Sequence, residues 1–282
     1  MKKITEYYQD GKIKKVYTVD KNGLKQGACR VYFKSGTLGE MMHFTDDKID
    51  GLYERYHQSG ALWKRCTLKD GRPCGVYESY YPNGQLKKRC TYADGCLNGK
   101  YEKFFKDGRK KISCYYKNDC YDGLCVLYRD NGNLWKRTFY KNRRKNGPQE
   151  EYYENGVLEA RCFFRNGLFD GFYERHYSNG QLQRRYFYKD GIKDGPYIEY
   201  WIDGQFVRSG VYRQDEELHG YEADEYLKHW KKEFNKKQER IHIDQQLKQL
   251  DKNMPPTYLR QIRKRALVTD FRQKYEKVSI RE

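Results

Sequence analysis

The sequence lacks most features of a compact enzyme or a membrane protein. Hydrophobic residues make up only 37% of its 282 residues, which is low for a globular core. No apolar run approaches the roughly 20 residues that a membrane-spanning helix needs. The first six residues contain no apolar stretch of the kind that a secretory signal requires, so we expect an intracellular, cytoplasmic protein.

Familiar catalytic and metal-binding spacings are also missing. The nine cysteines contain no C-x-x-C pair, and none of the six histidines lies in an H-E-x-x-H arrangement. Without an export signal, we expect the cysteines to be free thiols in a reducing compartment. We therefore expect no catalytic residue, no bound metal, no cofactor and no small-molecule substrate.

Aromatic and charged residues are abundant instead. Aromatics reach 16% of the chain, and 29 of them are tyrosines, which argues against disorder and favours thin layers with solvated faces. The formal net charge is +18. Such a charge attracts nucleic acid, an anionic membrane or an acidic protein, and it also serves simple solubility, so charge alone does not choose among these.

A 24-residue repeat organises most of the chain. Two glycine series keep this step eight times. The first is Gly27, Gly51, Gly75, Gly99, Gly123, Gly147, Gly171 and Gly195. The second is Gly36, Gly60, Gly84, Gly108, Gly132, Gly156, Gly180 and Gly204. Periods of this length are typical of repeat arrays, in which each unit is one supersecondary motif.

Turn signals divide each unit into two strands. Asn or Asp precedes most glycines of the second series, which predicts type I′ hairpin turns. Ten residues after each of these glycines we expect a second turn, at Asp46, Asp70, Asp94, Asn118, Asn142, Asn166 and Asp190. We expect the first glycine series to mark turns as well. Strand alternation places Lys88 and Cys90 on one face and Arg89 on the other. The sequence therefore predicts an all-β array of stacked antiparallel hairpins in an elongated, twisted sheet.

The unit, written G-x-Y-E-x-Y-Y-x-N-G-x-L-x-x-R, resembles the MORN-type repeat in its variant form, most closely at 75–98 and 171–194. The resemblance implies a β-array used for protein or membrane association. The array is similar to those of a bacterial antitoxin family and to arrays abundant in giant DNA viruses. The unit at Gly99 departs from the pattern because Arg109-Lys110-Lys111 replaces the usual Gln-Leu start, and the unit at Gly123 departs because Cys125 and Arg129 replace aromatics.

Two side-chain ladders are candidate sites. Cysteines recur at one unit position, where we expect small buried side chains rather than a metal site: Cys66, Cys90, Cys114 and Cys162. Arginines recur at another: Arg65, Arg89, Arg137, Arg161 and Arg185. Either these arginines pair with the recurrent glutamates across strands, or with neighbouring Lys64, Lys88, Lys136 and Arg184 they form a basic stripe for an extended anion.

The repeat stops at Gly220 and a helical period begins. We predict one helix over about 222–252, with Tyr226, Trp230 and Phe234 as a docking face, and a second helix after Pro255 and Pro256. The expected organisation is a partial capping repeat at 1–26, eight repeats at 27–219 and a helical tail at 220–282. We hypothesise that the tail covers the final sheet edge.

The best functional hypothesis is a non-enzymatic scaffold for protein–protein association, for example as a virion or assembly component. One alternative is an antitoxin-like binder that neutralises a toxic partner. Another is a binder of nucleic acid or an anionic lipid surface through the basic charge.

Overall fold

The chain forms one antiparallel sheet and one helix in a computed structural model, which describes residues 1–236. The strands of the first half are β1 (Lys2–Tyr7), β2 (Ile13–Val19), β3 (Lys25–Tyr32), β4 (Leu38–Thr45), β5 (Lys48–Tyr56), β6 (Leu62–Lys69), β7 (Arg72–Tyr80), β8 (Leu86–Ala93), β9 (Cys96–Phe104) and β10 (Lys110–Lys117). Those of the second half are β11 (Cys120–Tyr121), β12 (Gly123–Tyr128), β13 (Leu134–Lys141), β14 (Arg144–Tyr152), β15 (Leu158–Arg165), β16 (Leu168–His176), β17 (Leu182–Lys189), β18 (Ile192–Lys193), β19 (Gly195–Tyr200), β20 (Phe206–Arg213) and β21 (Glu216–Leu218). The predicted fold class is confirmed.

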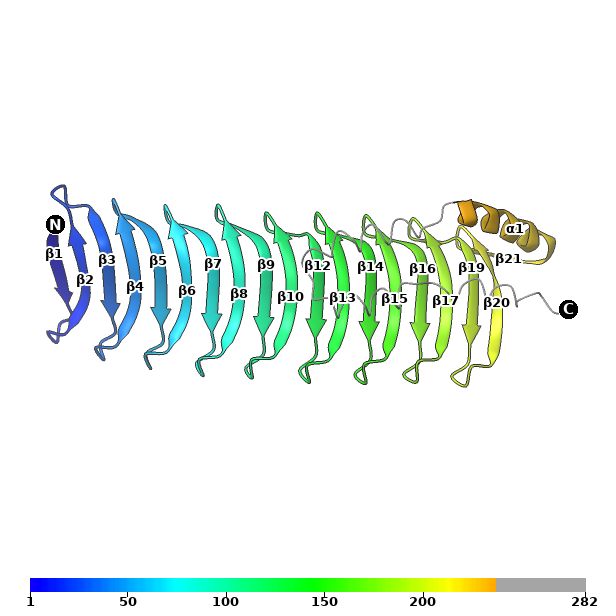
Figure 1. The fold of residues 1–282 in the computed structure, drawn as a ribbon, viewed down its shortest axis with the longest axis horizontal. Helices are drawn as coiled ribbons and strands as arrows, with labels where there is room; N and C mark the ends of the chain where they lie inside the picture. Colours follow the sequence, from blue (N-terminus) through cyan, green and yellow to red (C-terminus); the bar gives the residue numbers. More distant parts are fainter. Residues whose placement is uncertain (237–282) are drawn as a thin grey trace. The chain divides into compact units, whose positions relative to one another are not determined.

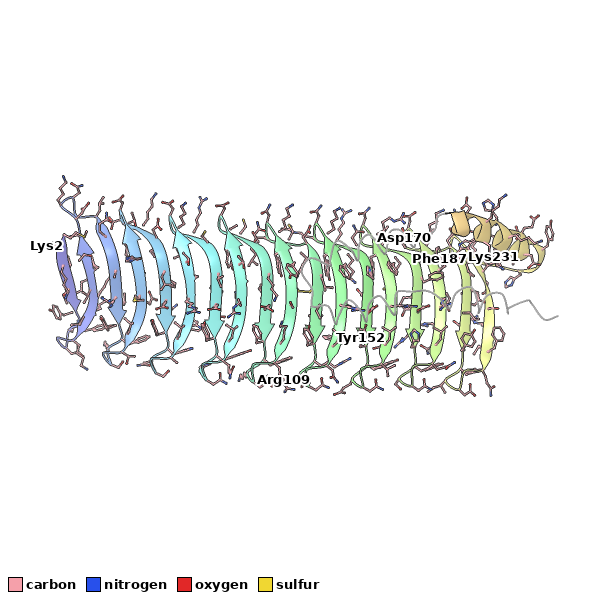
Figure 2. All side chains as sticks on the ribbon, in the orientation of Figure 1. Lys2, Arg109, Tyr152, Asp170, Phe187 and Lys231 are labelled. Carbon is pink, nitrogen blue, oxygen red and sulfur yellow. A yellow bond between two sulfur atoms is a disulfide. The ribbon has the colours of Figure 1, made fainter. Side chains whose placement is uncertain are left out.

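The strands follow one another along the sheet in chain order (Figure 1). Each pairs with its neighbours in the sequence, and β11 with β12, like β18 with β19, continues one interrupted strand. The sheet is open and has a single layer, so both of its faces are available to side chains (Figure 2). Residues 1–219 form one unit, and α1 (Gly220–Lys236) belongs to a second.

Turns lie at the second-series glycines and ten residues after them, as predicted, but the turns at these glycines are not type I′. At Asn83-Gly84 only the glycine has positive φ, and Gly84 N–H donates to Tyr81 C=O, so this is a three-residue turn closed by a left-handed glycine. Two consecutive residues with positive φ, as type I′ requires, occur at the opposite end of the unit, as in Asp94-Gly95. Proline and asparagine before Gly84 favour the longer turn, because proline fixes a negative φ.

The first glycine series lies inside strands and not at turns, which corrects that expectation. Gly51 sits within β5 at φ 113°, where the pairing with β4 shifts between Met42 and Phe44. A Cβ at Gly51 would approach the Cβ of His43 to 3.2 Å. Glycine is needed there because an irregular, left-handed backbone passes close to the neighbouring strand.

Hydrogen bonds from the turns hold each unit to the next. The hydroxyl of Tyr81 donates to the carbonyl of Phe104 (2.9 Å), and the amide of Asn83 donates to that of Lys106 (3.0 Å). Equivalent bonds recur at Tyr153, Asn155, Tyr177 and Asn179. Where Arg129 replaces the tyrosine, its guanidinium donates to the carbonyl of Tyr152 instead (2.8 Å). The departure from the repeat pattern therefore leaves the sheet continuous.

Candidate binding faces

One face of the sheet carries a row of alternating acids and bases, here called the Glu–Arg face. Its members lie directly opposite one another in consecutive strands: Glu54, Arg65, Glu78, Arg89 and Glu102, then Arg137, Glu150, Arg161, Glu174 and Arg185. Between the two blocks, Ser113 lies opposite Val126. All five predicted arginines are therefore in one row, and five glutamates compensate their charge.

The glutamates of this row are covered by their partners. Arg65 and Arg89 donate to the two carboxylate oxygens of Glu78 at 2.6 and 2.7 Å, and the Tyr80 hydroxyl donates at 2.7 Å. Only 3% of Glu78 is exposed. Burial alone would raise the pKa of Glu78, but the bonds from Tyr80, Arg89 and Arg65 outweigh it and lower the pKa. The carboxylate is therefore held ionised as part of the sheet.

Glu174 is held in the same way four units further along. Burial opposes ionisation of Glu174, and the charges of Arg161 and Arg185 overcome it, so its pKa is lowered. At Glu102 the lysines Lys100 and Lys110, each 2.9 Å from the carboxylate, have this role. The cross-strand pairing considered from the sequence is thus the arrangement found, although these carboxylates are buried rather than on a solvated surface.

The second face, here called the tyrosine face, carries the cysteine ladder. Its central row alternates thiols with aromatic rings: Cys66, Tyr77, Cys90, Tyr101 and Cys114. The ladder cysteines are 0–8% exposed, which confirms them as small buried side chains. A neighbouring aromatic ladder packs against this row with tilted rings, for example Tyr101 with Tyr116 at a 5.4 Å centroid distance. This face therefore presents ring surfaces in every unit.

The lysines next to the arginines lie on the tyrosine face, so a combined basic stripe does not exist. Lys88 points to the same side as Cys90, with its amine 4.2 Å from the centre of the Tyr77 ring, while Arg89 contacts Glu78 on the other side. The cause is the strand period of two, by which consecutive side chains face opposite ways. The strand alternation predicted for Lys88 and Arg89 already separates the two rows in the sequence.

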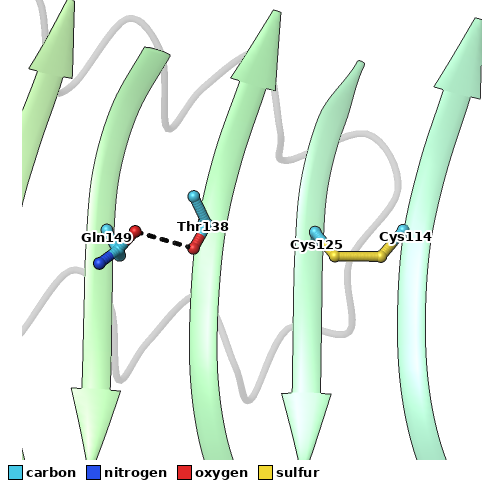
Figure 3. Close-up of a disulfide and its surroundings, with 4 residues drawn as sticks. All are labelled: Cys114, Cys125, Thr138 and Gln149. Carbon is cyan, nitrogen blue, oxygen red and sulfur yellow. Dashed lines mark hydrogen bonds between the residues drawn. A yellow bond between two sulfur atoms is a disulfide. The ribbon is translucent and has the colours of Figure 1, made fainter. Parts of the chain in front are cut away.

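One pair of cysteines departs from the expected free thiols. Cys114 and Cys125 face each other across β10 and β12 and form a disulfide (Figure 3). The equivalent partner of a ladder cysteine elsewhere is a tyrosine, such as Tyr101 opposite Cys90. Because Cys125 takes that tyrosine's place, two sulfur atoms meet. The other seven cysteines are free thiols.

Metal chemistry has no obvious place in the described array. Within residues 1–236, no three His, Cys, Asp or Glu side chains come together as metal ligands. His176 is held neutral, since burial lowers its pKa. Among the described residues, no helix is long and apolar enough to span a membrane. The recurrent polar groups instead bind one another.

The predicted docking face of the tail lies on α1. Tyr226 and Trp230 are four residues apart and therefore share one side of the helix. Phe234 belongs to the same helix. The predicted helix extends to 252, and its part beyond 236, together with the second helix, lies outside the described residues. Covering of the final sheet edge remains a hypothesis.

Comparison with known proteins agrees with the repeat. The family model described as "MORN repeat variant" matches residues 73–94, 121–142, 145–166 and 170–190, which is less than half of the chain and supports a MORN-type repeat protein. No curated protein matches. Among solved structures, that of TcdB2-TccC3-Cdc42 is 10% identical over 70% of this chain and 13% of its own (TM-score 0.20). That of TcdB2-TccC3 is 11% identical over 76% and 14% (TM-score 0.22). We draw nothing about function from these two likenesses.

Proposed function

We propose that this MORN-type array is a non-enzymatic scaffold that binds a protein partner through its Glu–Arg face. The observation that carries the proposal is the use of recurrent polar side chains within the sheet itself, as in the bonds of Glu78 to Arg65, Arg89 and Tyr80. Groups saturated in this way have little capacity for acid–base or nucleophilic chemistry, which needs a free donor or acceptor aimed at a substrate.

The composition of this face fits a protein partner. Leu52 and Val76, beside the charged row, are 45% and 52% exposed. Exposed apolar side chains next to internally compensated charges resemble protein interfaces, whose centres are depleted of unpaired charge. Roles as a virion component or as an antitoxin-like binder both fit such a scaffold, and they remain expectations from the family resemblance.

Site-specific photocrosslinking in the native source tests this proposal. A benzophenone amino acid replaces Leu52 or Val76 in the full chain, and Lys34 or Lys106, exposed near the turns, is replaced as the matched control. We expect a discrete crosslinked protein band from the two face positions and not from the turn positions. Equal labelling at all four positions, or no protein adduct at either face position, would contradict a protein-binding Glu–Arg face.

A further inference from the structure

The N-terminal half of the tyrosine face holds cations that the sheet does not neutralise. Strand register places Arg55, Lys64, Ser79, Lys88 and Lys103 directly opposite one another in consecutive strands from β5 to β9. Lys88 faces Lys103, and Arg55 faces Lys64. Like charges placed opposite one another across strands destabilise a sheet. Arg55 is paired with Glu40, so the repulsion between Lys88 and Lys103 is the local cost that an anionic ligand would relieve.

The three lysines of this row have aromatic rings rather than carboxylates as neighbours. We call Lys64, Lys88 and Lys103 the lysine track. Their amines lie 5.2, 4.2 and 5.8 Å from the ring centres of Tyr53, Tyr77 and Tyr101. Arg55 at the start of the row is paired with Glu40 at 3.2 Å, so it is not counted in the track. Each unit thus supplies a cation together with an aromatic face.

We infer that the lysine track binds single-stranded nucleic acid, with phosphates along Lys64, Lys88 and Lys103 and bases against the neighbouring tyrosines. Neighbouring strands are about 4.8 Å apart, so the track extends across the sheet over roughly 14 Å. An extended row of cations fits a chain of phosphates better than a single ion. This site lies on the opposite face from the proposed protein interface, and it goes beyond that function.

The tyrosines favour a nucleic acid over an acidic peptide. Tyr53, Tyr77 and Tyr101 are half-buried, with Cys66 and Cys90 recessed between them. Bases stack on such rings whatever their sequence, whereas the carboxylates of a peptide gain nothing from them. A single strand is required because bases in a duplex already stack on one another. Trp63, 37% exposed and 4.6 Å from the guanidinium of Arg55, adds another ring at the start of the track.

Fluorescence anisotropy with a labelled oligothymidylate and the full chain tests the inference. Three lysine–phosphate contacts predict a slope of log affinity against log salt of about −2, or roughly 20-fold weaker binding at 200 mM than at 50 mM salt. The variant Lys64→Gln/Lys88→Gln/Lys103→Gln should lose that dependence and most of the affinity. The variant Lys34→Gln/Lys69→Gln/Lys117→Gln removes the same charge from other exposed positions and should bind nearly as the parent does.

Two further measurements identify the ligand class. Tyr77→Leu should weaken oligothymidylate binding at least about fivefold and leave binding of polyglutamate unchanged, because only the bases use the ring. Circular dichroism and thermal melting verify that each variant is folded. The inference is overturned if both triple variants lose equal affinity, or if polyglutamate or phosphatidylserine vesicles bind as tightly with the same dependence on the track. Crosslinking at Leu52 and Val76 should be unchanged in the track variant, so this outcome is separable from protein binding.

Discussion

The two halves of the array have the same strand register on the tyrosine face but differ in the charge of the residues there. In the N-terminal half, Ser79 lies between Lys64 and Lys88. Exactly three repeat lengths later the equivalent position is Glu151, whose carboxylate is 2.7 Å from Lys136. Two further acids pair with cations of the C-terminal half, Glu159 with Arg175 and Glu199 with Arg208, while Arg184 lies opposite Arg175 without a salt bridge of its own among the described residues.

The Glu–Arg face shows no such difference, because both halves alternate acid and base there. A repeat constrains every unit to the same backbone register, so equivalent positions are a matched comparison within one chain. The missing acidic partners of the lysine track on the tyrosine face are therefore not a consequence of the fold. The Glu–Arg row, present in both halves, has a structural role, whereas the lysine track is available to a ligand.

Acidification should have the largest effect on the stability of the fold, because it protonates the paired carboxylates of both halves. The pKa values of Glu78, Glu102, Glu174 and Glu199 are lowered in the folded protein. Their stabilisation is complete above the unfolded value of about 4.5 and is lost as pH falls through the lower folded values. Thermal melts at pH 7, 5.5, 4 and 3 should show the main loss below about 4.5.

A smaller loss should come earlier and only in the C-terminal half. Burial lowers the pKa of His176, so the unfolded chain binds a proton first as pH falls through about 6.5. Protection from hydrogen exchange, taken relative to the intrinsic rate at each pH, should therefore fall in β16 and β17 between pH 6.5 and 5.5 before it falls in β7 and β8. Uniform exchange across both halves, or melts that are flat down to pH 3, would contradict the assignment of these groups.

Removing one buried carboxylate from either half should have the next largest effect, and an equal one. Glu78→Ala leaves Arg65, Arg89 and Tyr80 without their shared acceptor, and Glu174→Ala does the same to Arg161 and Arg185. Each should reduce the free energy of unfolding by about 3 kcal/mol, measured by urea denaturation. Glu154→Ala, at an exposed turn, is the control and should change it by under about 0.5 kcal/mol. A much larger loss in one half would show that the Glu–Arg row is not equivalent in the two.

The junction between the halves should respond to reductant. The disulfide between Cys114 and Cys125 lies where Ser113 and Val126 interrupt the Glu–Arg row. It joins residues 11 apart in sequence, for which loop entropy gives about 2–3 kcal/mol. Reduction should lower stability by that amount and raise hydrogen exchange in β10 and β12. Cys114→Ser/Cys125→Ser should already be less stable and insensitive to reductant. If reductant leaves the parent unchanged, the disulfide does not hold the junction.

The repeat made the fold predictable from sequence in its essentials. The spacing of the glycines predicted the order and the antiparallel pairing of the strands, because each 24-residue unit can bury its surface only against its neighbours. Turn types were predicted less well. Asn83-Gly84 carries the strongest type I′ signal yet forms a three-residue turn, and Asp94-Gly95 forms the two-residue turn. An Asn-Gly or Asp-Gly dipeptide indicates only that positive φ is tolerated at these residues. The length of the loop also depends on where the two strands begin to pair.

The candidate site was less accessible to sequence reasoning. The arginines could be found as a series, but their neutralisation depends on which glutamate lies opposite in the next strand. Register sets this, and bulges such as that at Gly51 shift it. The disulfide also needed Cys114 and Cys125 to be recognised as cross-strand neighbours. Periodicity reveals which positions are equivalent and leaves open which of them touch.

Exchanging the residues at the equivalent positions 79 and 151 should give the smallest effect on stability. It is also the most direct test of the difference in charge between the halves. Ser79→Glu should place a carboxylate between Lys64 and Lys88, as Glu151 is placed beside Lys136. Relative to Ser79→Gln, which has the same size at this buried position, one added opposite-charge pair should raise the free energy of unfolding by about 0.5–1 kcal/mol. The same change should weaken oligothymidylate binding, because the new carboxylate occupies the lysines that would contact phosphate. Ser79→Gln controls for side-chain size and should do neither.

The reciprocal variant, Glu151→Ser, should lower stability by a similar amount and strengthen oligothymidylate binding, since it uncovers Lys136. Urea denaturation and anisotropy on the same preparations report both quantities. A gain of stability without loss of binding in Ser79→Glu would mean that the charge difference between the halves is only structural. If Ser79→Glu gains stability and loses affinity while Glu151→Ser does the reverse, the lysines without an acidic partner are the ones that bind the ligand, because no other position changes.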